Sequence, residues 1–299
     1  MKKSKASGHL VIIGGAEDRK GDMPVLRHFV DLVPGKGPIV VLTAATDEPE
    51  KAWKTYEKGF GQLGVKRLEP LHVAQREQAN EAALYETVLK ARGVFMTGGD
   101  QAQLLSMLSG TRLCDALRRI YIEHGACIAG TSAGASALSE HMLGPMAAGE
   151  NPLDADVRLA AGLGFVLNAV IDQHFSERGR LARLLAVVAH NPKLIGVGID
   201  ENTALVIARG QGISVIGAGA VTLVDGREMR TRLIAQGDER EVFQATDVRL
   251  HLLPAGNGFV PSEPTGREGE ADVSPNMLQL VRLLAGTDAV DTQFREDDH

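Results

Sequence analysis

Short apolar runs alternate with longer amphipathic segments through the first two-thirds of the chain. The runs at 10–13, 38–44 and 93–96 have the length and composition of buried strands. Between them, segments such as 23–32 and 50–63 show the wider apolar spacing of a helix with one buried face. Strands that alternate with helices predict an α/β fold, with a mostly parallel sheet flanked by helices.

The same pattern continues to about residue 200. We expect further strands at 67–73, 126–130, 170–171 and 194–199, and further helices at 80–91, 102–108, 113–123 and 133–138. Serine is a favoured N-cap residue, so we expect a helix to begin after Ser176, with a buried apolar stripe over 181–188. The segment 141–164 has no regular period, and a long loop beside an active edge often shapes the pocket.

After residue 202 the pattern changes. Short apolar runs at 205–207, 213–216, 220–224 and 249–253 are separated by turns, which predicts an antiparallel extension of the sheet from about residue 203. We therefore expect one α/β hydrolytic domain over 1–260. Over residues 261–299 we expect a loop, a short helix at 277–284 and a flexible tail.

Composition narrows the class of protein. Hydrophobic residues make up 44% of the 299 and charged residues 23%, which suits a globular protein with a large core. The formal net charge of −6 argues against nucleic-acid binding. No apolar run approaches the roughly 20 residues that span a membrane, and the first run is too short for a secretory signal, so we expect a cytoplasmic protein.

Neither a metal site nor a cofactor site is indicated. Cys114 and Cys127 are the two cysteines, which suits a reducing compartment, and the nine histidines are scattered. Gly14-Gly15 follows the first strand, but the complete Gly-x-Gly-x-x-Gly of a dinucleotide site is missing. We expect no metal and no cofactor, and a Rossmann cofactor enzyme is the weakest alternative.

The strand at 126–130 leads into Gly130-Thr131-Ser132-Ala133-Gly134, the Gly-x-Ser-x-Gly pattern of a nucleophile elbow. A sharp strand-to-helix turn lifts the serine hydroxyl clear of the sheet, and glycine on both sides leaves room for that backbone. The N–H of Ala133 then faces any oxyanion that forms at the serine. The alternative is a turn rich in glycine and serine that has no catalytic role.

A second glycine pair, Gly98-Gly99, stands between a strand and a helix at the same predicted sheet edge. Free backbone N–H groups and the helix dipole make such a junction an anion site, where a hydrolase would hold its second oxyanion donor. A plain strand–helix turn is the alternative.

His174 follows a predicted strand and so falls at the edge where the elbow lies. We expect His174 to be the base that removes the serine proton. We expect either Asp200 or Glu201, which follow the next strand, to be the acid that orients this base. The order serine, histidine, acid differs from that of the α/β-hydrolases, in which the acid precedes the histidine.

Three arginines follow His174 at a predicted helix N-terminus, where cations are unfavourable: Arg178, Arg180 and Arg183. Arg180 and Arg183 share one edge of the helix. This placement favours anion binding, and a solvated basic face is the alternative.

Four blocks in this order resemble the serine peptidase family that contains the cyanophycinases and the aspartyl dipeptidases. They are 97–101, 130–135, 172–175 with the three arginines, and 198–204, within a resemblance that covers about 8–260. It implies a class I glutamine-amidotransferase-like fold, a homodimer, no metal, and a serine exopeptidase that hydrolyses cyanophycin. That polymer is polyaspartate with arginine on each β-carboxyl group. The resemblance implies that it is cleaved through an acyl-enzyme and that the products are β-Asp-Arg dipeptides.

Carried over residue by residue, the resemblance implies Ser132 as the nucleophile, His174 as the general base and Glu201 as the third member of a triad. The backbone N–H groups of Gly99 and Ala133 correspond to the oxyanion hole. The substrate-contact positions correspond to Gln101, Asp172, Gln173, Arg178, Arg180 and Arg183.

Two alternatives stay open within this resemblance. One is an aspartyl dipeptidase of the same family that cleaves small peptides, although the block 172–175 with its arginines favours the polymer. The other is a catalytically silent binding protein on the same fold, which the intact serine, histidine and glutamate disfavour.

Overall fold

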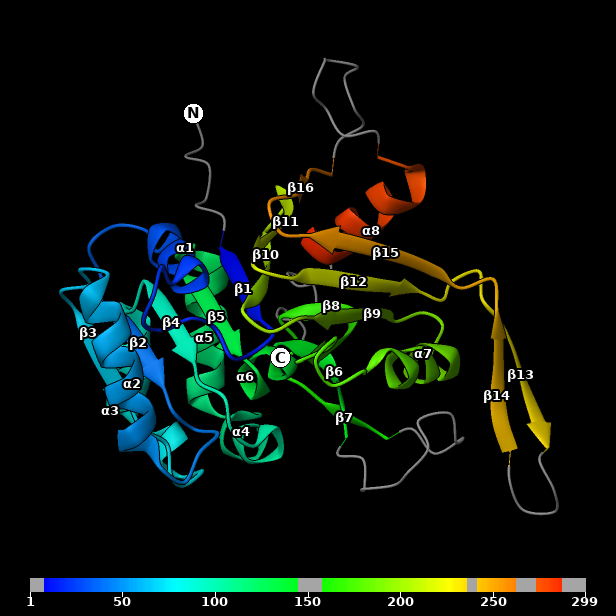
Figure 1. Cartoon of the computed structure of the whole chain (residues 1–299). Helices are drawn as coiled ribbons and strands as arrows, with labels where there is room; N and C mark the ends of the chain where they lie inside the picture. Colours follow the sequence, from blue (N-terminus) through cyan, green and yellow to red (C-terminus); the bar gives the residue numbers. More distant parts are fainter. Residues whose placement is uncertain (1–7, 145–157, 236–240, 262–272, 287–299) are drawn as a thin grey trace.

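Strand β1 (His9–Ile13) lies inside the first of two large sheets in the computed structural model, which describes residues 8–144, 158–235, 241–261 and 273–286. On one side of β1, the parallel part of the sheet contains β5 (Cys127–Thr131), β4 (Gly93–Met96), β2 (Ile39–Leu42) and β3 (Leu68–Leu71). On the other side, the antiparallel part contains β10 (Thr203–Ala208), β11 (Gly212–Gly217) and β16 (Gly258–Phe259). Figure 1 shows the resulting order, β16-β11-β10-β1-β5-β4-β2-β3.

The second sheet has the order β15-β12-β9-β8-β6-β7. Its parallel centre contains β6 (Ser139–Leu143), β8 (Val166–Gln173) and β9 (Ile195–Ile199). Antiparallel strands flank this centre: β12 (Ala220–Asp225), β15 (Arg249–Pro254) and β7 (Leu159–Ala161). A separate ribbon, β13 (Arg230–Ala235) with β14 (Glu241–Thr246), projects beyond the end of this sheet (Figure 1).

Helices cover both sheets. One face of the first sheet carries α1 (Pro24–Leu32) and α2 (Pro49–Gln62). The other face meets α3 (Ala82–Lys90), α4 (Gln101–Leu108), α5 (Arg112–Glu123), α6 (Ala133–Ala137) and a short 3₁₀ turn (Gln78–Asn80). Helix α7 (Leu181–His190) packs on β9 and β12, and α8 (Pro275–Ala285) packs on β8, β10 and β11. None of the helices in the described ranges is both long and apolar enough to cross a membrane.

The alternation of side chains along β1 separates two cores. Val11 and Ile13 point to the side of α1 and α2, where an aromatic group that includes Phe29 and Phe95 is fully buried. Leu10 and Ile12 point to the opposite side, where helices and the inner face of the second sheet share one continuous core. The central strands of the first sheet are therefore buried on both faces, as their continuous apolar runs predict.

The α/β class and the helical flanks are as expected, but the strands divide differently. We expected the runs at 170–171 and 194–199 to extend one parallel sheet. They belong to β8 and β9 of the second sheet, because β10 occupies the edge of β1 and pairs with it antiparallel. The predicted irregular segment 141–164 contains β7 and most of β6, and its central part, 145–157, lies outside the described residues.

The helix expected to begin after Ser176 begins later, at Leu181. Gly179 has a φ angle of 59°, which interrupts a right-handed helix. The Ser176 hydroxyl donates to Asp200 (2.5 Å) instead of capping a helix. Arg180 is therefore the residue at the N-cap, and among the three arginines only Arg183 lies inside α7.

Helix α8 is integral to the core, although it lies beyond residue 260, where we ended the predicted domain. Met277, Leu280 and Val281 are buried in the core that the two sheets share. The other parts of the predicted loop and tail, 262–272 and 287–299, lie outside the described residues.

We expect Leu280→Ala to lower the free energy of unfolding by about 2–5 kcal/mol, because it leaves a cavity at a fully buried position. Leu283→Ala is the matched control on the same helix, since Leu283 is 39% exposed, and it should cost less than about 1 kcal/mol. Urea unfolding of the two variants measures the difference. Equal losses would contradict the packing of α8 described here.

Candidate active site

Ser132 occupies the sharp turn between β5 and α6. Its φ and ψ angles are 53° and −110°, a conformation that residues other than glycine rarely adopt. Its carbonyl oxygen accepts hydrogen bonds from the N–H groups of Ala135 (3.0 Å) and Ser136 (3.1 Å), which start the helix. A Cβ atom on Gly130 would lie 2.3 Å from the carbonyl oxygen of Gly134, and one on Gly134 would lie 2.7 Å from the carbonyl oxygen of Met96, so neither position has room for a side chain.

His174 follows β8 directly and also has a positive φ angle, 47°. Its Nε2 atom lies 3.0 Å from Oγ of Ser132, and its Nδ1 atom lies 2.5 Å from Oε1 of Glu201. A carboxylate can only accept a hydrogen bond, so Glu201 favours the tautomer with a proton on Nδ1. Nε2 then presents its lone pair to the serine hydroxyl, which is the arrangement a general base needs.

The sequence left two acids open as the partner of His174, and the structure distinguishes them. Glu201 contacts the imidazole, whereas Asp200 accepts from the hydroxyl of Ser176 and from the N–H of Ala220 (3.0 Å). Asp200 therefore ties β9 to β12 and to the turn after His174. The His174 side chain is 12% exposed and that of Glu201 is 35% exposed, so the chain of contacts opens to solvent at its acidic end.

The loop after β1 holds the three segments together, which sequence reasoning missed. Three successive carbonyl groups, those of Ile13, Gly14 and Gly15, accept hydrogen bonds from the backbone N–H groups of Ser132 (3.0 Å), His174 (2.8 Å) and Asn202 (2.9 Å). The signal was present as Gly14-Gly15, which we considered only as a cofactor motif.

Gly15 explains why this loop needs glycine. Its φ angle is 100°, and a Cβ atom built on it would lie 2.4 Å from Cε1 of His174. The imidazole therefore rests directly against the loop backbone, and any side chain at this position would displace it.

Gly99 and Ala133, the two residues predicted to donate to an oxyanion, both lie in turns that lead from a strand to a helix. Ala133 is the first residue of α6, so its N–H has no acceptor within the helix. Gly99 has a φ angle of 143°, and a Cβ atom on it would lie 1.9 Å from the carbonyl oxygen of Ala45. The N–H of Asp100 donates to that same carbonyl (2.7 Å), which fixes the Gly98-Gly99 turn against the segment after β2.

Arg180 and Arg183 do not form a solvated basic face. Both donate to the carboxylate of Asp172, which is 1% exposed: Arg180 from Nη1 (3.0 Å), and Arg183 from Nε (2.6 Å) and Nη2. The guanidinium side chains are themselves only 13% and 18% exposed. Two positive charges against one negative charge leave one positive charge in surplus.

Arg180 is the arginine whose pKa responds to this crowding of charge. Burial lowers the pKa of its guanidinium; Asp172 opposes this shift, and the charges of Arg183 and Arg178 add to it. A bound anion would relieve the repulsion among the arginines. Arg178 itself is exposed, and its N–H donates to the carbonyl oxygen of His174 (3.2 Å).

The two glutamines predicted to contact substrate, Gln101 and Gln173, differ in whether their side chains already have hydrogen-bond partners. Gln101 begins α4, and its Nε2 donates to the carbonyl oxygen of Leu143 (2.6 Å) at the end of β6. Gln173 precedes His174, and its Oε1 atom is buried without a hydrogen-bond donor in the described part of the chain. A buried acceptor without a donor is costly, so this atom is suited to a donor brought by a ligand.

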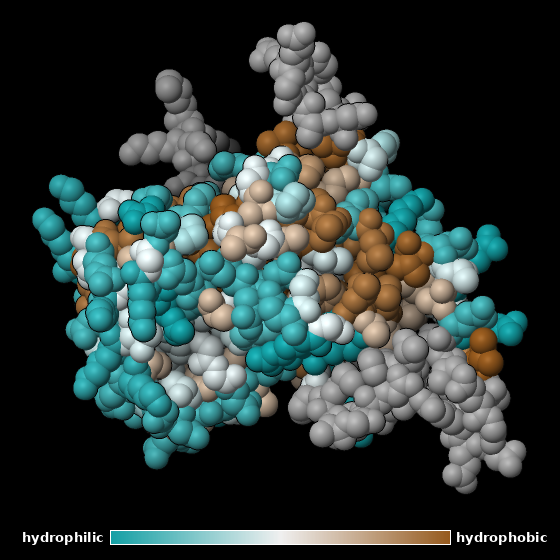
Figure 2. Space-filling model, in the orientation of Figure 1, coloured by the Kyte–Doolittle hydropathy of each residue, from teal (hydrophilic) through white to brown (hydrophobic). Residues whose placement is uncertain are grey.

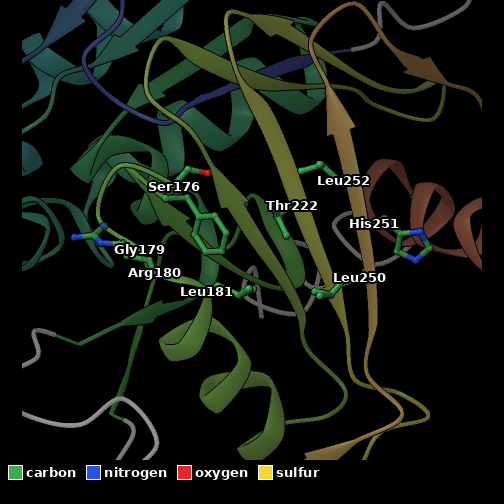
Figure 3. Close-up of a pocket in the computed structure, with 9 residues that line it drawn as sticks. Ser176, Gly179, Arg180, Leu181, Thr222, Leu250, His251 and Leu252 are labelled. Atoms are coloured by element: carbon green, nitrogen blue, oxygen red, sulfur yellow. The ribbon is translucent and has the colours of Figure 1, made fainter.

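A cavity of about 380 Å³ lies beside this region, lined by Arg180, Ser176 and Thr222 and by Leu181, Leu250 and Leu252. Figure 3 shows Leu250, Leu252 and Thr222 on one side of their strands and His251 on the other. Figure 2 shows the apolar side chains gathered on this face, over β15 and the start of α7. Ser132, His174 and Glu201 do not line the cavity, so it is separate from the hydrogen bonds that join these three residues, whereas Arg180 borders it.

Comparison with known proteins decides the family. The model of peptidase family S51 matches residues 10–216. The chain belongs to this family. It is therefore a serine-type peptidase, a hydrolase. Across the described ranges no group of three or more His, Cys, Asp and Glu side chains could hold a metal ion.

Relatives of this S51 peptidase include two cyanophycinases. That of Geminocystis herdmanii is 35% identical over 251 residues, which cover 84% of this chain and 92% of the relative. That of Synechococcus elongatus is 35% identical over 257 residues, which cover 85% and 80%. The crystal structure of a peptidase from an acI-B1 actinobacterium has the same fold, with a TM-score of 0.61 and 23% identity over 87% of this chain and all of that one.

We expect Gly15→Ala to reduce the peptidase activity by at least about tenfold, because the new methyl group displaces the imidazole of His174. Gly35→Ala is the matched control: Gly35 also has a positive φ angle, 71°, but a Cβ atom there meets nothing within 4 Å. The control should lose some stability and keep its activity. If both variants lost activity equally, backbone strain rather than contact with His174 would be responsible.

Proposed function

We propose that this S51 peptidase hydrolyses cyanophycin and releases β-Asp-Arg dipeptides. The observation that carries the proposal is the continuous hydrogen-bonded series from Oγ of Ser132 through the imidazole of His174 to Glu201. The two cyanophycinases that are 35% identical over most of the chain support the choice of substrate.

In the proposed reaction, Nε2 of His174 removes the proton of Ser132 as Oγ attacks the scissile carbonyl carbon. The backbone N–H groups of Gly99 and Ala133 donate to the oxygen that becomes negative. The protonated imidazole gives its proton to the departing amine, which leaves an ester on Ser132. A water molecule, activated by the same imidazole, then hydrolyses the ester and restores the serine. Glu201 stabilises the imidazolium in both steps.

The arginines supply the proposed substrate recognition. An exopeptidase has to recognise a charged end of its substrate, and a β-Asp-Arg unit carries a free carboxylate. The single surplus positive charge on Arg180 and Arg183 would bind it, while the buried Asp172 holds both guanidinium planes in place. This gives Asp172 a supporting role, since both of its oxygens are already occupied.

Gln173 is suited to the other part of the substrate. Its buried Oε1 is an acceptor directly before the catalytic histidine, so a substrate N–H group would satisfy it. Gln101 would hold the end of β6 through the carbonyl oxygen of Leu143, and Arg178 would add positive charge from the exposed side. A small-peptide aspartyl dipeptidase is the remaining alternative, and the pair of arginines favours the polymer. The homodimer and the cytoplasmic location stay predictions.

Ser132→Ala should reduce the release of soluble dipeptide from insoluble cyanophycin by at least about 1,000-fold, because the nucleophile is absent and only binding and the oxyanion donors remain. Ser106→Ala, an exposed serine on α4, is the matched control and should behave like the wild type. Wild-type turnover by Ser132→Ala would refute the triad.

A chelator should have no effect on the activity of the wild-type protein, and activity lost in EDTA and restored by zinc would contradict a serine mechanism.

Arg183→Lys should lower kcat/KM for cyanophycin by at least about tenfold, or about 1.4 kcal/mol, because lysine cannot reproduce the two-pronged contact with Asp172. Labelling of Ser132 by a small serine-directed inhibitor should be retained. Arg119→Lys, whose arginine pairs with Glu123 on the exposed side of α5, controls for the substitution itself. Unchanged polymer turnover by Arg183→Lys would contradict the proposal that these arginines bind substrate.

A further inference from the structure

Glu17 is a buried acid that the proposed reaction does not use. It lies in the loop between β1 and α1 and is 3% exposed. Its Oε1 atom accepts from the hydroxyl of Tyr56 (2.6 Å), and its Oε2 atom accepts from the hydroxyl of Thr131 (2.5 Å). Removing a carboxylate from water is costly, and these two hydrogen bonds offset part of that cost.

One of these two hydrogen bonds comes from Thr131, the residue directly before Ser132. Thr131 is the last residue of β5, it is 2% exposed, and the next residue is Ser132. The strained φ and ψ angles of Ser132 persist only where the surroundings restrain the backbone on both sides. On the C-terminal side, α6 provides this restraint; on the N-terminal side, the side chain of Thr131 is tied to Glu17.

The other contact anchors Glu17 in a rigid part of the core. The ring of Tyr56 packs on Phe95 and Phe60, with centroid separations of 4.6 Å and 6.2 Å. Burial and the negative charge of Glu17 raise the pKa of the Tyr56 hydroxyl well above its ordinary value, so Tyr56 remains a donor. Glu17 therefore connects the nucleophile elbow to the aromatic core under α1 and α2.

The same loop also restrains the other side of the site. The N–H of Asp18 donates to Oδ1 of Asn202 (2.9 Å), next to Glu201. The carboxylate of Asp18 accepts from three backbone N–H groups, those of Lys20, Gly21 and Met23, which stiffens the loop. Glu17 thus extends from a segment that is already held in place.

We propose that Glu17 is a positioning residue for the nucleophile: through the hydroxyl of Thr131 it holds Ser132 in the orientation in which Oγ meets Nε2 of His174. The inference rests on the proposed role of Ser132 as the nucleophile, but not on the identity of the substrate. Because the arginines and glutamines of the substrate site lie elsewhere, loss of this contact should affect the chemical step and spare binding.

The test uses Thr131→Val, which keeps the shape of threonine and removes its hydroxyl. We expect kcat and the second-order rate of Ser132 labelling by a fluorophosphonate to fall together by about tenfold, with KM within about twofold of the wild type. Thr131→Ser, which keeps the hydroxyl, should recover most of the rate. Glu17→Gln, which keeps the size but leaves one oxygen to accept two hydroxyls, should lower the labelling rate in the same direction.

Thr111→Val is the matched control. Thr111 is 1% exposed, and its hydroxyl donates to the carbonyl oxygen of Leu108 (2.7 Å) at the N-cap of α5, a helix that contributes no residue to the candidate site. This variant should lose stability but label at the wild-type rate. Wild-type labelling and kcat in both Thr131→Val and Glu17→Gln would overturn the proposal, as would equal losses in Thr111→Val.

Labelling also separates this inference from the proposed function. A wild-type protein that labels at Ser132 but does not digest cyanophycin would refute the substrate, and the variants would still decide the role of Glu17. A wild-type protein that does not label at Ser132 would refute both.

Discussion

Three consecutive carbonyl groups after β1 impose the constraint on which the site depends. They accept the N–H groups of Ser132, His174 and Asn202, so three segments distant in sequence are held by one short loop. Backbone hydrogen bonds of this kind fix position without using the side chains that react. Ser132 and His174 can therefore both adopt unfavourable φ angles, because each is held by neighbours on either side.

Local sequence patterns predicted the parts of the site that local geometry determines. The Gly-x-Ser-x-Gly run predicts a turn that only glycine allows, and the physical reason is that a Cβ atom would collide with Gly134 from position 130 and with Met96 from position 134. The Gly98-Gly99 pair predicted a turn before a helix on similar grounds. His174 and Glu201 could be placed at strand ends, since a strand ends where its apolar run ends. The alternation of apolar runs and amphipathic segments predicted the α/β class.

Long-range packing escaped this reasoning. Nothing in the short runs at 170–171 and 194–199 shows that β10 occupies the edge of β1 and leaves β8 and β9 to start a second sheet. The arginines were expected to face solvent or substrate, but pairing with Asp172 depends on an approach between β8 and α7 that no spacing rule contains. The sequence gives no sign of the contacts of Glu17, because its partners stand 39 and 114 residues away in the chain.

The division of the strands between two sheets also divides the chemistry. Ser132 and the two backbone donors lie at the edge of the first sheet, whereas His174, Glu201 and the arginines follow strands of the second. In the proposed reaction, the residues that attack and the residues that transfer protons and bind substrate thus belong to separate structural layers. Substitutions within the second layer can alter which peptide is accepted while the nucleophile keeps its setting. A single scaffold of this type can in this way diversify its substrates without rebuilding its reactive centre.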